Sequence, residues 1–130
     1  MSTCKWDRHF LGLALAHARM SKDPNTKVGA IIVGPDRELI SAGFNGFPRG
    51  IEDSDERLTN RDLKLKLIVH AEMNAVLAAA RHGIQLKGMH SVSRSNKRGN
   101  RFGVGRTTMY SLHCRNHAGR DYRNCKPSCD

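Results

Sequence analysis

The chain has 130 residues, a formal net charge of +10 and four cysteines. A chain of this length fits one domain, which can bury a core without disulfides. Its first residues contain no long apolar run, so we expect neither a signal peptide nor a membrane-spanning helix there. A cytoplasmic location with reduced cysteine thiols follows as the expectation.

The positive charge is concentrated near the end of the chain. Residues 1–89 hold 13 Lys and Arg against 10 Asp and Glu, whereas residues 90–130 hold 9 against 2. Such asymmetry is typical of a basic arm that binds nucleic acid or an anionic membrane. One alternative interpretation is therefore a basic nucleic-acid-binding protein that uses this Arg- and Lys-rich tail.

The first part of the chain predicts one helix followed by one hairpin. Apolar residues recur at helical spacing over about residues 5–20, and an Asp-Pro-Asn sequence ends that helix. Two short apolar runs, 28–33 and 39–44, flank a Gly-Pro-Asp turn and predict a hairpin buried on both faces. Residues 45–62 lack periodicity and predict a long loop, which in a compact domain is often functional.

Alanine dominates residues 69–81, which predict a second helix. Gly83 is placed to end this helix in a left-handed cap. Its expected apolar stripe consists of Met73, Val76, Leu77 and Ala80. After Met89 the pattern ends, because residues 91–101 have no apolar period, and this stretch predicts a disordered segment.

His70-Ala71-Glu72 lies at the start of the second predicted helix. An imidazole at this position can ligate a metal while the carboxylate lies close to a metal-bound water. This is the H-x-E half of the zinc deaminase pattern, whose other half is P-C-x-x-C. By itself the pair is a weak signal, because a His-x-Glu on a helix is more often part of an exposed surface.

Three segments in order and spacing resemble the deoxycytidylate (dCMP) deaminase family. They are residues 21–30 (SKDPNTKVGA), 43–50 (GFNGFPRG) and 70–75 (HAEMNA). The resemblance covers about residues 5–89 and implies an α/β fold, a three-layer sandwich whose central mixed sheet is flanked by helices. We expect a deaminase domain over 1–89, incomplete after residue 89, and a basic tail without family resemblance over 90–130.

The resemblance also implies a chemistry and a set of site residues. His70 would bind Zn²⁺, a zinc-bound hydroxide would attack C4 of the cytosine, and Glu72 would carry the proton to the leaving ammonia. Asn45 would contact the nucleotide sugar, with a left-handed turn residue as the structural alternative. Lys27 and Arg49 would contact the phosphate, with solvated basic side chains as the alternative. The expected partners are a small nucleotide substrate and further copies of the chain, not nucleic acid or a membrane.

The sequence departs from the family at the second half of the metal site. A zinc ion needs three or four protein ligands, and one histidine cannot hold it. No P-C-x-x-C is present, since Cys125 and Cys129 have three residues between them and Cys114 precedes Arg-Asn-His. The chain as written is therefore expected to be inactive, and a nonenzymatic remnant is a further alternative.

A shifted reading frame explains this departure economically. The Met109 codon is ATG, and reading one nucleotide later gives TG followed by the T of the Tyr110 codon, which encodes cysteine. Leu112 followed by His113 permits a second cysteine. With permitted synonymous codons, residues 104–125 reread as WGGPPCTRCTVEIMQAGITEIV and residues 90–103 as TLYLAATNEATGLA. We therefore expect a one-nucleotide insertion near the Met89 or His90 codon, in the gene or in its record.

The substrate has its own alternatives within the same fold. A free nucleoside, another nucleobase or tRNA adenosine would fit the same H-x-E chemistry. The Asp-Pro-Asn and Phe-Asn-Gly sequences favour a nucleotide. A substrate panel separates these possibilities.

Overall fold

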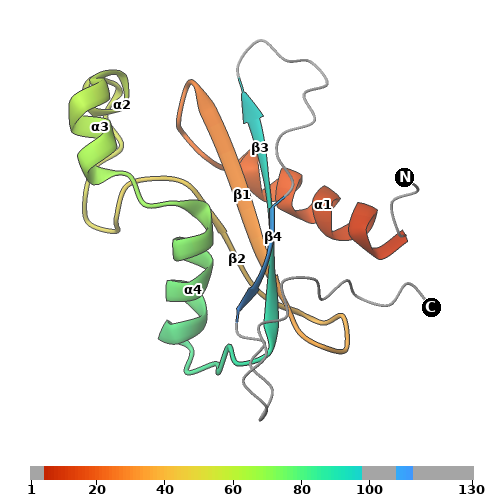
Figure 1. The fold of residues 1–130 in the computed structure, drawn as a ribbon. Coiled ribbons are helices and arrows are strands. Elements are labelled where there is room, and N and C mark those ends of the chain that lie inside the picture. The colour runs from red at the N-terminus through yellow and green to blue at the C-terminus, as the bar shows by residue number, and fades with distance from the viewer. Residues whose placement is uncertain (1–4, 98–107, 113–130) are drawn as a thin grey trace.

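A computed structural model of the chain describes residues 5–97 and 108–112. Within these ranges four helices and four strands follow one another (Figure 1). In chain order they are α1 (Lys5–Ala18), β1 (Thr26–Val33), β2 (Leu39–Phe44), α2 (Asp55–Thr59), α3 (Arg61–Leu67), α4 (Ala71–Arg81), β3 (Met89–Lys97) and β4 (Thr108–Leu112). The helix predicted near 5–20 and the hairpin are confirmed.

The described strands form one sheet in the order β2-β1-β3-β4. Helix α1 packs on one face of this sheet and α4 on the other (Figure 1). This arrangement confirms the expected α/β class with helices flanking a central sheet, although the four described strands pair only in antiparallel fashion where a mixed sheet was expected. A parallel pair needs a crossover of about a dozen residues or more, and residues 98–107 are too few for one.

The face of the sheet under α1 holds the apolar core. Phe10 of α1 packs against Ile31 and Val33 of β1 and Val92 of β3, all of them buried. The expectation of a hairpin buried on both faces holds for β1 but not for β2. Strand β2 lies at the edge of the sheet, where Leu39 is 52% exposed.

Small residues line the contact between α4 and the other face. Ala71, Ala75 and Ala79 are buried, and a Cβ on Gly43 of β2 would lie 2.5 Å from the Ala71 carbonyl oxygen, so the helix backbone approaches the strand closely. Gly83 follows the helix with φ +67°, which confirms the predicted left-handed end.

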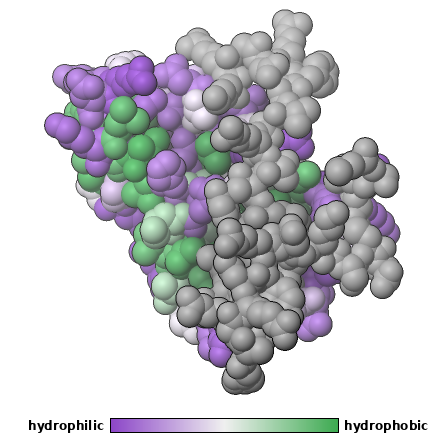
Figure 2. Space-filling model, viewed as in Figure 1, coloured by the Kyte–Doolittle hydropathy of each residue, from purple (hydrophilic) through white to green (hydrophobic). Residues whose placement is uncertain are grey.

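The predicted apolar stripe of α4 is wrong as the packing face. Met73 and Leu77 are each 53% exposed, because a close helix–strand approach selects alanine and leaves the larger side chains outside. Figure 2 shows hydrophobic surface among hydrophilic residues on the side of the molecule that carries α3 and α4.

The long loop predicted over 45–62 is also wrong in its second half. Helix α2 and the start of α3 lie there, and each has a polar N-cap. The Ser54 side chain accepts a hydrogen bond from the Arg57 backbone N–H, and the Asn60 side chain accepts one from that of Leu63. Such caps stabilise short helices whose sequences show no apolar period.

The disorder predicted after Met89 is wrong for part of that segment. Strand β1 pairs with β3 along its whole length, from Thr26 opposite Lys97 to Val33 opposite His90. Backbone hydrogen bonds to β1 form the strand despite side chains without an alternating pattern. Residues 98–107 and 113–130 of the expected tail lie outside the described residues.

A membrane-spanning helix was not expected from the sequence. Across residues 5–97 and 108–112, no helix is long and apolar enough to cross a membrane.

Candidate active site

The H-x-E motif begins helix α4. His70 is the N-cap residue with extended dihedral angles, φ −65° and ψ 150°, and its exposed side chain makes no capping hydrogen bond. Its carbonyl oxygen accepts from the Asn74 backbone N–H at 3.0 Å, which closes the first turn. Glu72 lies partly buried in that first turn, where the helix dipole favours a carboxylate. The motif thus presents an unbonded imidazole and a half-buried carboxylate at one helix end.

The end of β2 is fastened to the start of α4. Gly46 and Val69 exchange two backbone hydrogen bonds, at 3.2 Å and 2.8 Å. The Asn74 side-chain amide donates to the Phe44 carbonyl oxygen at 2.8 Å. These bonds bring the Gly-Phe-Asn-Gly segment beside His70, as expected for one site built from two distant motifs. The sequence did not predict that Asn74 links α4 to β2, because an Asn within an alanine-rich helix gives no signal of its hydrogen-bond partner.

Asn45 joins the end of β2 to the start of β1. It is 6% exposed, its side-chain oxygen accepts from the Val28 backbone N–H at 2.8 Å, and its amide donates to the Thr26 carbonyl oxygen at 2.9 Å. The Ser21 hydroxyl donates to the Asn45 carbonyl oxygen at 2.8 Å. Asn45 therefore has a structural role, and its second amide N–H can donate to a ligand. The sugar contact stays a prediction.

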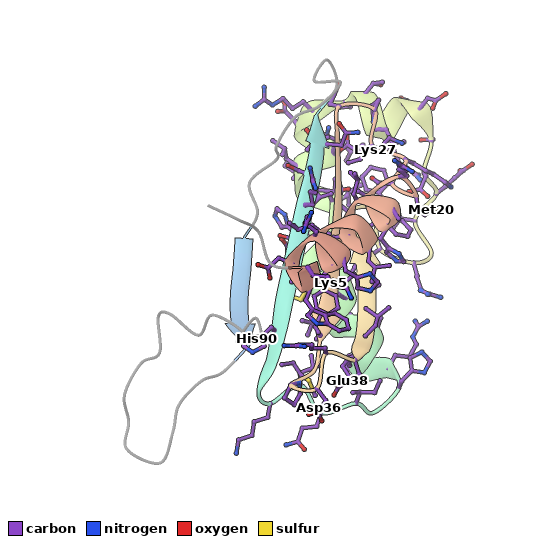
Figure 3. All side chains as sticks on the ribbon, turned by 90° about the vertical axis from the view of Figure 1, so that its right-hand side faces the viewer. Lys5, Met20, Lys27, Asp36, Glu38 and His90 are labelled. Carbon is purple, nitrogen blue, oxygen red and sulfur yellow. The ribbon has the colours of Figure 1, made fainter. Side chains whose placement is uncertain are left out.

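Lys27 lies between the two β1 residues that Asn45 binds. Its ammonium donates to the Ser21 carbonyl oxygen. Figure 3 shows Lys27 toward the end of the sheet where Met20 also lies, with Asp36, Glu38 and His90 at the opposite end. Because side chains alternate along a strand, Lys27 shares with Gly29 and Ile31 the face of β1 that packs on α1.

Asp23 organises the segment before β1. Its side chain accepts from the backbone N–H groups of Asn25 and Thr26, at 2.8 Å and 3.2 Å, and pairs with the Lys64 ammonium at 3.3 Å. Both partners of the ion pair are buried, with side chains 4% and 12% exposed. The Asp-Pro-Asn sequence signalled this turn, whereas nothing in the sequence signalled Lys64 as its partner.

Arg49 lies apart from the other predicted phosphate ligand. Its exposed side chain borders a pocket of about 610 Å³ between β2 and α4, which Asn74, Arg81 and His82 also line. His70, Glu72, Asn45 and Lys27 do not line that pocket. Asn45 bonds the backbone of the two residues that flank Lys27, whereas the exposed Arg49 borders the separate pocket.

The described residues do not fit a zinc ion. Within residues 5–97 and 108–112, no group of three or more His, Cys, Asp or Glu side chains could hold a metal. Cys4, Cys114, Cys125 and Cys129 all fall outside those ranges. His70 is exposed, and the described residues include no cysteine that could supply the thiolates of a zinc site of this type.

Similarity to known proteins extends over most of the chain. The model of the cytidine and deoxycytidylate deaminase zinc-binding region matches residues 4–114. An uncharacterized deaminase in the luxG 3′ region of Aliivibrio fischeri is 43% identical over 77 residues, which is 59% of this chain and 51% of that protein. The deoxycytidylate deaminase of Homo sapiens is 35% identical over 81 residues, 56% of this chain and 44% of that protein.

The fold has a solved counterpart. The crystal structure of dCMP deaminase from the cyanophage S-TIM5 in complex with dCMP and dUMP gives a TM-score of 0.55 at 23% identity, covering 73% of this chain and 67% of that one. The chain spans about half the length of the curated relatives it matches. The family match over residues 4–114 includes both the end of β2 and the start of α4. The chain therefore belongs to the cytidine and deoxycytidylate deaminase zinc-binding family.

Proposed function

We propose that this protein acts on a cytosine nucleotide and converts dCMP and water to dUMP and ammonia. The observation that carries the proposal is the H-x-E motif at the N-terminal end of α4, fastened by Gly46 and Val69 to the segment that holds Asn45. Relatives named deoxycytidylate deaminase support dCMP as the substrate.

Glu72 is the proposed proton carrier. The oxygen of the attacking water forms a bond to C4, the bond from C4 to the amino nitrogen breaks, and Glu72 passes the proton lost by the water to the departing nitrogen. A half-buried carboxylate at a helix N-terminus suits this role, because it is held in place yet reachable. General acid–base catalysis of this kind contributes roughly 10²–10⁴-fold to a rate.

The nucleotide's polar groups have proposed partners in three segments of the chain. Asn45 would donate its second amide N–H to the sugar, and Lys27 would offer its remaining ammonium N–H groups to the phosphate. Arg49 is the proposed phosphate ligand from the exposed side. A homo-oligomer and a cytoplasmic location remain predictions.

His70 is the residue that the family resemblance assigns to Zn²⁺. Because the described residues do not complete a metal site, we assign no step to the metal in this chain. We expect the protein as written to show no turnover, and the alternative substrates stay open until they are measured.

A substrate panel tests the proposal. Deamination of dCMP, CMP, deoxycytidine, cytosine and tRNA adenosine would be compared for the chain as written and for a version in the shifted frame. Turnover with dCMP foremost supports the proposal, and a shifted-frame protein that binds zinc but prefers another substrate overturns it.

A further inference from the structure

Strand β3 occupies a central place that calls for apolar side chains. It lies between β1 and β4, and both α1 and α4 pack against it. Val92 is 1% exposed and belongs to the core under α1. Ser91 and Ser93 alternate with it and are 4% exposed each. A strand covered on both faces normally reads as a nearly continuous apolar run.

The two serines share a face with apolar residues of β1. Ser91 is the register partner of Ile32, and Ser93 is the partner of Ala30, so the serines lie on the side of the sheet that faces α4. The Ser91 hydroxyl is buried without a hydrogen-bond partner in the described part of the chain. A buried hydroxyl without a partner is unfavourable, and most such groups in folded proteins are bonded.

Three departures from a well-formed deaminase start at the same point of the chain. Most of the excess positive charge lies after residue 89, where 9 Lys and Arg face 2 Asp and Glu. The buried face of β3 carries serines from residue 91 onward. The sequence after residue 89 contains no P-C-x-x-C, the thiolate half of the zinc deaminase pattern. Three unrelated defects that share one starting point favour one cause.

We propose that the chain is read one nucleotide out of frame from about residue 90 onward, relative to the sequence that this fold evolved to carry. In the shifted frame, a TCT codon at Ser91 or at Ser93 becomes part of a leucine codon. Each buried serine position then holds an apolar side chain. The burial of these two positions is a structural reason for the shift that does not depend on the cysteines.

The same frame also supplies the two missing cysteines. This part of the inference rests on the proposed function, because only a deaminase needs them. Cysteine at position 109 is forced, because ATG followed by the T of a tyrosine codon allows nothing else. Cysteine at position 112 requires that the Leu112 codon end in G and the His113 codon begin with C, as every histidine codon does. Proline at position 108 requires that the Thr108 codon end in C.

The nucleotide sequence of the gene decides the matter directly. We expect the Ser91 and Ser93 codons to be TCT, the Leu112 codon to end in G and the Thr108 codon to end in C. We also expect the shifted frame to be free of stop codons from position 90 through position 125. Codons other than TCT or AGT at both serines, a Leu112 codon that does not end in G, a Thr108 codon that does not end in C, or a stop in the shifted frame would overturn the inference, since AGT gives valine where TCT gives leucine.

Resequencing also separates the two sources of the shift. A gene that lacks the extra nucleotide near the Met89 or His90 codon places the error in the recorded sequence. A gene that contains it places the lesion in the organism, and peptide masses of the natural protein would then match the chain as written. Either result supports the shifted frame only when the codons named above are found, and other codons overturn it in both cases.

Zinc content gives a test at the level of the protein that does not depend on turnover. The chain as written and the shifted-frame chain would be purified without chelators and their bound zinc measured by elemental mass spectrometry. We expect about one zinc per shifted-frame chain and none per written chain. His70→Ala in the shifted-frame chain should remove that zinc, while the matched exposed variant His82→Ala should retain it.

The outcomes are distinguishable from a failure of the proposed function. Stoichiometric zinc in the chain as written would show that its own tail completes the site and would overturn the inference. Zinc in the shifted-frame chain without dCMP turnover would uphold the frame and refute the substrate. A shifted-frame chain that does not fold under conditions in which the written chain folds would overturn the inference, because that frame would not supply the side chains that the fold requires.

Discussion

Strands β1 and β3 lie side by side in one sheet, pair over eight residues and differ in what they bury. From Ala30 to Val33, β1 presents an unbroken apolar run that is at most 5% exposed. At the same depth β3 presents Ser91, Val92 and Ser93. The backbone of β3 makes the ladder hydrogen bonds with β1. Its side chains toward α4, in contrast, are serines where a buried strand normally has apolar residues.

Buried polar groups show the same contrast. In the first part of the chain Ser21, Asp23 and Asn45 are buried, and each makes hydrogen bonds that fasten one segment to another. The Ser91 hydroxyl makes none, and Asp7 Oδ1 is the other such buried atom in the described ranges. Buried polar groups before residue 89 thus mostly fasten segments together, whereas the Ser91 hydroxyl of β3 bonds to nothing in the described ranges.

The largest expected effect tests whether the first part of the chain holds the catalytic carboxylate. Glu72→Gln in the shifted-frame protein should lower kcat by about 10²–10⁴-fold, because the amide cannot carry the proton. Steady-state dCMP deamination measures it, with the exposed variant Glu56→Gln as the matched control. A loss below tenfold, or an equal loss in the control, would remove Glu72 from the proposed role.

The buried ion pair before β1 should give the largest effect on stability. Asp23→Ala leaves the Lys64 ammonium without its partner and removes two bonds to backbone N–H groups, so we expect a loss of about 3–5 kcal/mol in the free energy of unfolding. Urea denaturation measures it. Lys22→Ala breaks the exposed pair with Asp53 and should cost less than about 1 kcal/mol. Equal losses would show that burial of the first pair has no consequence.

The apolar run of β1 should be sensitive to truncation. Ile32 is fully buried, and Ile32→Ala should lower the free energy of unfolding by about 2–5 kcal/mol through lost burial and a residual cavity. Leu39→Ala, at the exposed edge, should change it by about 0.5 kcal/mol or less. Similar losses at both positions would mean that the face of β1 toward α4 is not part of the core.

A variant at Asn45 distinguishes a structural role of this side chain from a contact with the substrate. Asn45→Ala removes two hydrogen bonds between β2 and β1, and we expect a loss of about 2 kcal/mol in the free energy of unfolding. A sugar contact would in addition raise the KM for dCMP more than the KM for cytosine. An equal change for both substrates would assign Asn45 to the structure alone.

Most of the fold could be predicted from the first 89 residues because their apolar pattern matches their burial. The helix at 5–18 and the hairpin follow from periodicity that packing reinforces. Helices α2 and α3 were missed because their stability depends on the caps at Ser54 and Asn60, which lie within a polar sequence. Strand β3 was missed because its serines give no strand signal and only pairing with β1 reveals it.

The candidate site could be predicted in its residues but not in its connections. The H-x-E motif marked the start of α4, since its chemistry dictates residue types at fixed spacing. The bonds from Asn45 to β1 and from Asn74 to Phe44 join residues 17 to 30 positions apart, and such pairings depend on tertiary structure. The face of α4 was also misjudged, because close approach at Gly43 favours alanine over Met73 and Leu77.

The smallest expected effect gives the sharpest test of the contrast between β1 and β3. Ile32 of β1 has a serine as its register partner in each neighbouring strand. Ser41 on β2 donates its hydroxyl to the Ala75 carbonyl oxygen at 2.8 Å, whereas Ser91 on β3 has no partner. Ser41→Ala should cost about 1 kcal/mol, and Ser91→Ala should raise the free energy of unfolding by about 1 kcal/mol as an unpaired hydroxyl is removed. Urea denaturation of the two variants in parallel measures the difference in sign. If Ser91→Ala destabilises the protein as Ser41→Ala does, the serine suits its place in β3, and the structural argument that β3 carries the wrong side chains fails.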